Sequence, residues 1–116
     1  IVALGSFFAK GRRVVESLEE KGINATLINP RYASGIDETV LDDLKRDHRL
    51  VVTLEDGSLD GGFGERVCRY YGPTDMKTKC FGVRKALYDR YDVNQLMRDN
   101  CLTDEQIVDW IVSAMK

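Results

Sequence analysis

The sequence predicts an α/β domain whose mostly parallel sheet carries helices on both faces. Short apolar stretches alternate about four times with amphipathic ones, and parallel neighbouring strands need such crossover connections. The apolar run that ends near residue 54 enters a glycine-rich loop and then a helical pattern, which is typical of a site edge in an α/β sheet. The chain of 116 residues has the size of one domain with one core.

The first half of the chain contains two of these alternations. The expected elements are strands at 1–5 and 25–29 and helices at 9–21 and 37–47. Gly22 marks the end of the first helix, and Pro30 ends the second strand. Asp37 is the expected N-cap of the second helix, with Ile36 and Leu41 at the positions of a hydrophobic staple.

The second half continues the alternation and ends in two helices. The expected elements are strands at 50–54 and 79–83, a helix at 64–71 that Gly72 and Pro73 close, a short helix after Asp92, and a terminal helix after Thr103. Asp92 with Gln95, and Thr103 with Gln106, each fit the spacing of a capping box. In the terminal helix, the apolar residues are spaced for one buried face: Ile107, Trp110, Ile111 and Met115.

The charge pattern argues against two classes of partner. The net charge is -2, and acidic and basic residues are mixed along the chain. A basic stripe suited to nucleic acid and a polybasic end suited to a membrane surface are both missing from the sequence. We therefore expect neither nucleic acid nor a membrane as a partner.

Three cysteines, Cys68, Cys80 and Cys101, are widely separated and odd in number. This usage predicts free thiols within the elements and favours a reducing, cytoplasmic location. The chain opens on Ile1 inside an apolar run, so we expect it to be a piece of a longer protein.

The residue pattern contains no catalytic set. His48 is the one histidine, and we interpret it as a loop or helix-end residue rather than a base. The cysteines and histidine lack metal-ligand spacing, and the glycines at 61, 62 and 64 match neither a dinucleotide fingerprint nor a phosphate loop. The start of the helix after this loop could receive an anion. Glu55 and Asp56 either contact a ligand or partner there, or they are solvated at the loop or cap that helix.

Cationic residues follow two expected strands at the carboxyl edge of the sheet. Arg31 follows the strand at 25–29, and Arg84 and Lys85 follow the strand at 79–83. An arginine in this place can hold a phosphate or carboxylate with a hydrogen-bonded fork. The alternative is a solvated rim of surface cations.

Two segments carry a resemblance to a known family. Residues 27–37, Leu-Ile-Asn-Pro-Arg-Tyr-Ala-Ser-Gly-Ile-Asp, resemble the strand, Arg-Phe and Pro-Leu-Asp stretch of transketolase-like thiamine-diphosphate enzymes. Residues 52–64, with Val-Thr-Leu-Glu-Asp-Gly and Gly-Gly-Phe-Gly, resemble the loop that follows in those enzymes. The likeness spans nearly the whole chain, 1–116, as one C-terminal domain, and it is greatest to the 1-deoxy-D-xylulose-5-phosphate synthase family.

The resemblance implies a three-layer α/β/α domain with a five-stranded mixed sheet. It implies a parent that condenses pyruvate with glyceraldehyde 3-phosphate and releases carbon dioxide, serving isoprenoid-precursor and thiamine biosynthesis. The parent would use thiamine diphosphate and Mg²⁺ held by its other domains and would form a homodimer, whereas this domain would bind no cofactor and be inactive alone. Arg31 stands where the family's arginine reaches the substrate phosphate.

Two places depart from the synthase pattern. Ser34-Gly35-Ile36 replace Lys-Pro-Leu, and Arg90-Tyr91 stand in place of His-Gly. A paralogue therefore stays open, as does another transketolase-like enzyme such as a 2-oxo-acid dehydrogenase β-subunit. In the second case the domain would serve subunit assembly and partner docking, with the glycine loop as an interface to neighbouring domains or subunits.

Overall fold

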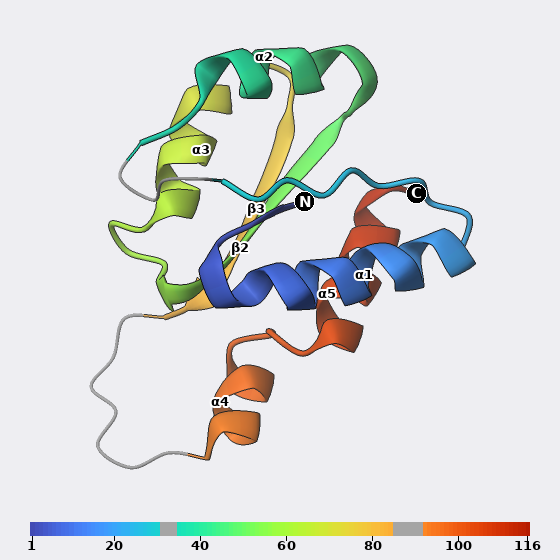
Figure 1. Cartoon of the computed structure of the whole chain (residues 1–116), viewed down its shortest axis with the longest axis vertical. Coiled ribbons are helices and arrows are strands. Elements are labelled where there is room, and N and C mark those ends of the chain that lie inside the picture. Colours follow the sequence, from blue (N-terminus) through green and yellow to red (C-terminus); the bar gives the residue numbers. More distant parts are fainter. Residues whose placement is uncertain (31–34, 85–91) are drawn as a thin grey trace.

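A computed structural model describes residues 1–30, 35–84 and 92–116. Its elements follow in the order β1 (Val2–Ala3), the 3-10 helix η1 (Gly5–Phe7), α1 (Phe8–Glu20), α2 (Glu38–Asp47), β2 (Leu50–Ser58), α3 (Phe63–Tyr71), β3 (Lys77–Val83), α4 (Val93–Asp99) and α5 (Asp104–Ala114) (Figure 1). The α/β class is confirmed over these residues, and so is the expected order of elements apart from the strand expected at 25–29.

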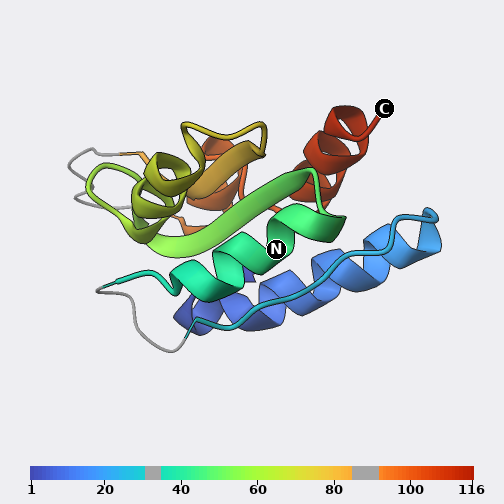
Figure 2. The same cartoon turned by 90° about the horizontal axis from the view of Figure 1, so that it is seen from above.

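The sheet has three parallel strands in the order β1, β2, β3. Figure 2 shows the curved strand β2 running through the middle of the molecule. The resemblance implied five strands with one antiparallel, and the described residues form these three without an antiparallel neighbour.

The strand predicted at 25–29 is wrong, because this segment makes only one isolated parallel bridge between Ile28 and Val2 of β1. Ile28 donates to the carbonyl of Ile1 at 2.8 Å, and Ala3 donates to the carbonyl of Ile28 at 3.0 Å. β1 is only two residues long, and Pro30 has no N–H with which to continue the ladder. Pairing therefore stops after one bridge.

Helices cover both faces of the sheet, as predicted (Figure 1). Val2 and Val51 belong to the cluster that packs under α2 and α3, whereas Ala3 and Val52 belong to the cluster under α1 and α5. This alternation follows from the two-residue period of a strand. The result is a three-layer arrangement with a separate apolar core on each side of the sheet.

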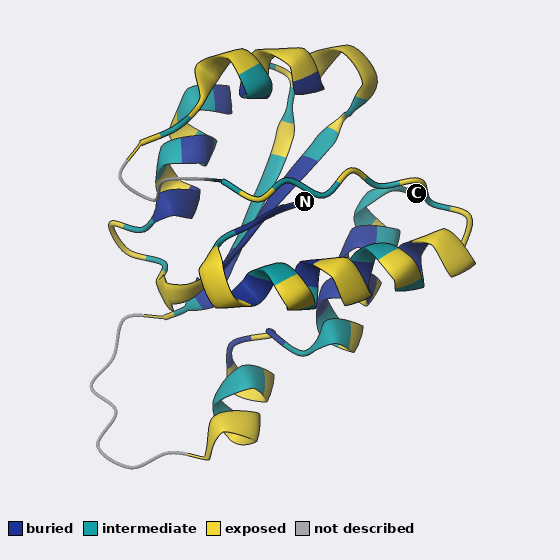
Figure 3. Cartoon of the chain, in the orientation of Figure 1, coloured by how far each residue is buried: buried dark blue, intermediate teal, exposed yellow. Residues whose placement is uncertain are grey.

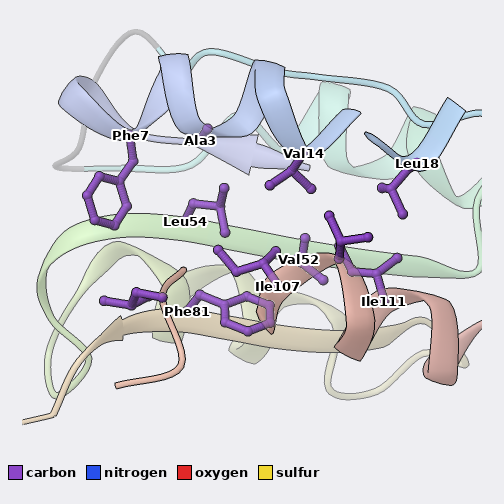
Figure 4. Packing of buried hydrophobic residues seen from close by; sticks show 11 residues of the cluster. Ala3, Phe7, Val14, Leu18, Val52, Leu54, Phe81, Ile107 and Ile111 are labelled. Carbon is purple, nitrogen blue, oxygen red and sulfur yellow. The ribbon is translucent and has the colours of Figure 1, made fainter. Parts of the chain in front are cut away.

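The larger core lies between α1, the sheet and α5. Figure 4 shows its side chains pointing toward one another from these elements, and it includes Leu18, Leu54, Phe81, Ile107 and Ile111. Figure 3 shows the same pattern, with buried positions on the strands and on the inner sides of the helices. The buried face predicted for the terminal helix is confirmed at Ile107 and Ile111.

Local signals set most helix ends. Gly22 has a φ of +81°, and its N–H donates to Glu19 while that of Ile23 donates to Leu18, the pattern of a Schellman C-cap. Asp37 caps α2 by accepting from the Val40 N–H at 3.2 Å. Thr103 and Gln106 form the predicted capping box of α5.

The capping box predicted for α4 is only half present. The Asp92 carboxylate accepts from the N–H of Asn94 at 2.8 Å and caps the helix. Gln95 instead donates to the carboxylate of Asp99 at 2.7 Å, one turn further along. The oxygen of the Gln95 side chain accepts from the Arg98 guanidinium at 2.8 Å, so side chains at i+3 and i+4 take up the amide that the box would need.

Candidate functional site

A bulge in β2 gives the carboxyl edge of the sheet its local shape. The strand was predicted to stop at residue 54, but it continues to Ser58 across an irregularity. Leu54 pairs with Phe81 and Ser58 pairs with Val83, so three residues of β2 lie opposite the single residue Gly82 of β3. Bulges re-aim side chains next to sites, and here the bulge begins at Glu55.

Glu55 is buried, with 4% of its surface exposed, and it caps α3 from outside the helix. Its Oε2 accepts from the N–H of Phe63 and its Oε1 from the N–H of Gly64, both at 3.0 Å. These two N–H groups belong to the first turn of α3, which lacks partners of its own. The negative charge of the carboxylate also interacts favourably with the positive N-terminal end of the helix dipole.

The glycines of the loop allow this approach. A Cβ built on Gly62 would lie 2.7 Å from Glu55 Oε1 and 2.5 Å from the carbonyl oxygen of Ser58. A Cβ built on Gly64 would lie 2.6 Å from the Thr53 hydroxyl and 2.8 Å from the sulfur of Cys80. Real Cβ atoms do not come so close, so α3 can sit on the sheet only with glycine at these positions.

These contacts decide between the two interpretations of the loop. Of the alternatives for Glu55, the capping one is confirmed, because the start of α3 is already occupied by a carboxylate of the same chain. The close approach at Gly62 and Gly64 is made to the domain's own strands. A contact of this loop with neighbouring domains stays a prediction.

The other residues singled out at this edge also have partners within the chain. Asp56 is exposed and accepts a 2.6 Å hydrogen bond from the hydroxyl of Ser6 in η1. Arg84 donates its N–H to the Asn100 side chain at 2.9 Å and a guanidinium N–H to the carbonyl of Asp99. Arg84 therefore anchors the end of β3 to the end of α4, while Lys85 lies outside the described residues.

A cavity of about 870 Å³ opens beside this edge, between the segment around Ile28 and the starts of α2 and α3. Its lining includes Pro30 and Gly35, the described residues on either side of 31–34. Arg31 itself lies outside the described residues, so its predicted role is not tested. Among the described lining residues, the ionisable side chains are Asp37 and Glu38, both acids.

His48 lies at the C-terminal end of α2, as expected for a helix-end residue. Its Nδ1 lies 3.2 Å from the Leu44 carbonyl and its Nε2 lies 2.8 Å from the Thr26 hydroxyl. Within residues 1–30, 35–84 and 92–116, no three His, Cys, Asp or Glu side chains gather in a way that could hold a metal ion. None of the helices in that part of the chain has the length and apolar character needed to cross a membrane.

One pair of side chains was missed by the sequence analysis. Cys68 of α3 and Cys80 of β3 are free and half-buried, as predicted, but their sulfurs lie 3.0 Å apart. Cys101, by contrast, is exposed in the turn before α5. The two cysteines are 12 positions apart, and no local signal connects them, because their contact depends on how α3 packs over the strands.

The parallel sheet between two helical layers, with its internally capped helix at the carboxyl edge, defines a three-layer α/β domain. The chain belongs to the transketolase C-terminal domain family, whose model matches residues 1–107.

Two of the curated relatives are 1-deoxy-D-xylulose-5-phosphate synthases. A 1-deoxy-D-xylulose-5-phosphate synthase of Mycobacterium leprae (strain Br4923) is 31% identical over 119 residues, which cover 97% of this chain. The synthase of Alkaliphilus oremlandii (strain OhILAs) is 33% identical over 113 residues, which cover 96% of this chain. In both cases the match spans only 18% of the relative's own length.

A solved structure gives the same family by shape. A split-gene transketolase in an inactive beta4 tetramer superposes with a TM-score of 0.82 at 27% identity. The match covers 97% of this chain and 36% of that one. The resemblance to transketolase-like enzymes is thereby confirmed at the level of the domain.

Proposed function

We propose that this chain is the C-terminal domain of a 1-deoxy-D-xylulose-5-phosphate synthase or a close paralogue. The observation that carries the proposal is the identity of 31–33% to synthases over nearly the whole chain, together with membership of the family. The parent would join pyruvate to glyceraldehyde 3-phosphate with loss of carbon dioxide. The five-stranded mixed sheet of the family stays a prediction for the parent's domain.

Within that parent, Arg31 is the residue that we assign to the phosphate of the acceptor. The cavity of about 870 Å³ is lined by residues on both sides of the segment that contains Arg31. Its described charged residues, Asp37 and Glu38, are acids and would repel a phosphate. The positive charge must therefore come from elsewhere, and a guanidinium suits a phosphate because it donates two parallel hydrogen bonds.

Thiamine diphosphate would supply the carbanion chemistry of such a parent. The described residues do not fit this cofactor's metal, because they bring no suitable cluster of ligands together. Following the resemblance, we assign thiamine diphosphate and Mg²⁺ to other domains of the same polypeptide, and we assign substrate positioning and assembly, in a homodimeric parent, to this domain.

The test is an activity assay on the full-length protein. Carbon dioxide release should require both pyruvate and glyceraldehyde 3-phosphate, and omission of either should abolish formation of the five-carbon product. Release that is independent of the phosphorylated acceptor, or transfer from a ketose donor instead of pyruvate, would assign the parent to another branch of the transketolase-like enzymes.

A second candidate is favoured by the solved split-gene transketolase in its tetramer. On this alternative, the chain belongs to a separate subunit, as in a 2-oxo-acid dehydrogenase β-subunit, and contributes to subunit assembly and partner docking. The protein would then be inactive until mixed with a second subunit. Light scattering and activity before and after mixing distinguish this case from a single-chain synthase, which is active alone.

A further inference from the structure

The packing of α3 on the sheet brings two thiols into contact. Cys80 pairs with Thr53 across the β2–β3 ladder, and both side chains lie on the face that α3 covers. Gly64 lets the start of α3 approach both residues closely. One turn along the helix, the sulfur of Cys68 lies 3.0 Å from that of Cys80.

We propose that Cys68 and Cys80 form a reversible redox site, which hydrogen peroxide oxidises to a disulfide between α3 and β3. The sulfurs must close from 3.0 Å to about 2.05 Å, which requires a movement of about 1 Å. Both side chains are half-buried rather than enclosed, and β3 is an outer strand of the sheet that the described residues form. The pair thus lies near the surface, where a small oxidant can reach it.

The two thiols are chemically unequal. The hydrogen bond from Cys80 lowers the pKa of Cys68 to about 6, against burial that raises it, and the Thr78 hydroxyl lowers it further. The same hydrogen bond raises the pKa of Cys80, and burial adds to this effect. Glu65, on the same helix, acts against ionisation of Cys68, but the net direction makes Cys68 the thiolate at neutral pH.

The reaction balances in two steps. The Cys68 thiolate attacks one oxygen of hydrogen peroxide, so an S–O bond forms, the O–O bond breaks and hydroxide leaves. The Cys80 sulfur then attacks the sulfenic sulfur of Cys68, so the S–S bond forms and the S–O bond breaks. The hydroxide released in this step takes the proton of Cys80 and leaves as water.

Oxidation would fix one helix to one strand near the carboxyl edge. The first turn of α3 donates two hydrogen bonds to Glu55. Phe63, the first residue of α3, lines the cavity beside that edge. A covalent link from the same helix to β3 would restrain this region. In a reducing compartment such a bond is transient and reports oxidising conditions.

The test is peptide mapping of the full-length protein after treatment with hydrogen peroxide. Trypsin cleaves after Arg66, Arg69, Lys79 and Arg84, so the disulfide would join peptides 67–69 and 80–84. This linked species, lighter by two hydrogen atoms than the two free peptides, should accumulate and should disappear after dithiothreitol. The peptide 99–116, which contains Cys101, is the internal control and should remain unlinked.

Variants make the assignment specific. Cys101→Ser should keep the linked species, whereas Cys68→Ser and Cys80→Ser should lose it. In the Cys80→Ser protein, Cys68 should instead be trapped as a sulfenic acid by dimedone. The proposal is overturned if peptides 67–69 and 80–84 stay separate in the wild-type protein when Cys101 is already fully oxidised, or if either cysteine pairs with another partner.

Hydrogen exchange supplies a second, independent measurement. In the oxidised protein, the amides of α3 should exchange several-fold more slowly than in the reduced protein, because local opening of the helix from β3 is blocked. Equal exchange in α3 before and after full oxidation would contradict the structural effect. The same comparison on Cys80→Ser should show no slowing.

Discussion

The carboxylate of Glu55 accepts a 3.0 Å hydrogen bond from the N–H of Gly64, nine residues further along the chain. This contact joins the bulge of β2 to the first turn of α3. It also explains two parts of the motif at residues 52–64 together. Glu55 supplies the cap, and Gly64 allows the helix to come close to the sheet. The motif that identifies the family therefore has a structural role inside the domain.

Replacing the Glu55 carboxylate by an amide should destabilise the fold. In Glu55→Gln, one of the two buried N–H donors of α3 faces an NH₂ group instead of an oxygen, so we expect a loss of about 1.5–3 kcal/mol in the free energy of unfolding. Urea denaturation of the 116-residue chain measures it. Asp56→Asn is the matched control, because Asp56 is exposed, and should change stability by less than about 0.5 kcal/mol. Equal effects of the two would refute the internal cap.

Adding a methyl group at Gly64 should also be costly. In Gly64→Ala, the new Cβ would lie 2.6 Å from the Thr53 hydroxyl and 2.8 Å from the Cys80 sulfur, so α3 must shift. We expect a loss of about 1–3 kcal/mol. The control is Gly57→Ala near the end of β2, where a Cβ would meet no other part of the chain within 4 Å. This change should be neutral or stabilise by up to about 1 kcal/mol. A stable Gly64→Ala would show that α3 does not need this close approach.

The ion pairs between α1 and α5 should make stability depend on pH. Asp104 contacts Lys10 and Arg13, each at 2.7 Å. Burial raises the pKa of Asp104, but the hydrogen bonds and charges of Arg13 and Lys10 outweigh it, so the pKa lies below its usual value. Because the pKa of Asp104 is lower in the folded state, its ion pairs stabilise the fold fully above the pKa of the unfolded state, near 3.9. This stabilisation is lost as the pH falls through the pKa of the folded state.

The measurement compares Asp104→Asn with the wild type between pH 7 and pH 3. At pH 7 the variant should be less stable by about 0.5–1 kcal/mol, and the difference should narrow below about pH 4. Asp109→Asn, an exposed change on the same helix, should leave the pH dependence as in the wild type. A difference that stays constant to pH 3 would contradict the role given to Asp104.

The parts of the fold that the sequence predicted well depend on local signals. Asp37 and Thr103 cap helices through residues three positions away, and Gly22 ends α1 within two residues. The apolar run at 50–54 likewise predicted the central strand from its own composition. Such features need no knowledge of the rest of the chain.

The parts that escaped prediction depend on distant contacts. The segment around Ile28 has strand-like composition but only a two-residue partner in β1. The sequence left the role of Glu55 open between ligand contact and capping, because the deciding bulge opposite Gly82 exists only once β2 and β3 are paired. The contact between Cys68 and Cys80 likewise requires the packing of α3 on β3.

The most direct test of the proposed function is the kinetic effect of Arg31→Ala in the full-length protein. The KM for glyceraldehyde 3-phosphate should rise by about 10- to 100-fold, the equivalent of losing a charge-assisted contact of about 1.5–3 kcal/mol, while the KM for pyruvate should change less than about twofold. Arg46→Ala, an exposed arginine on α2, is the control and should leave both constants unchanged. An equal rise in both KM values, or no rise in either, would contradict the assignment of Arg31 to the substrate phosphate.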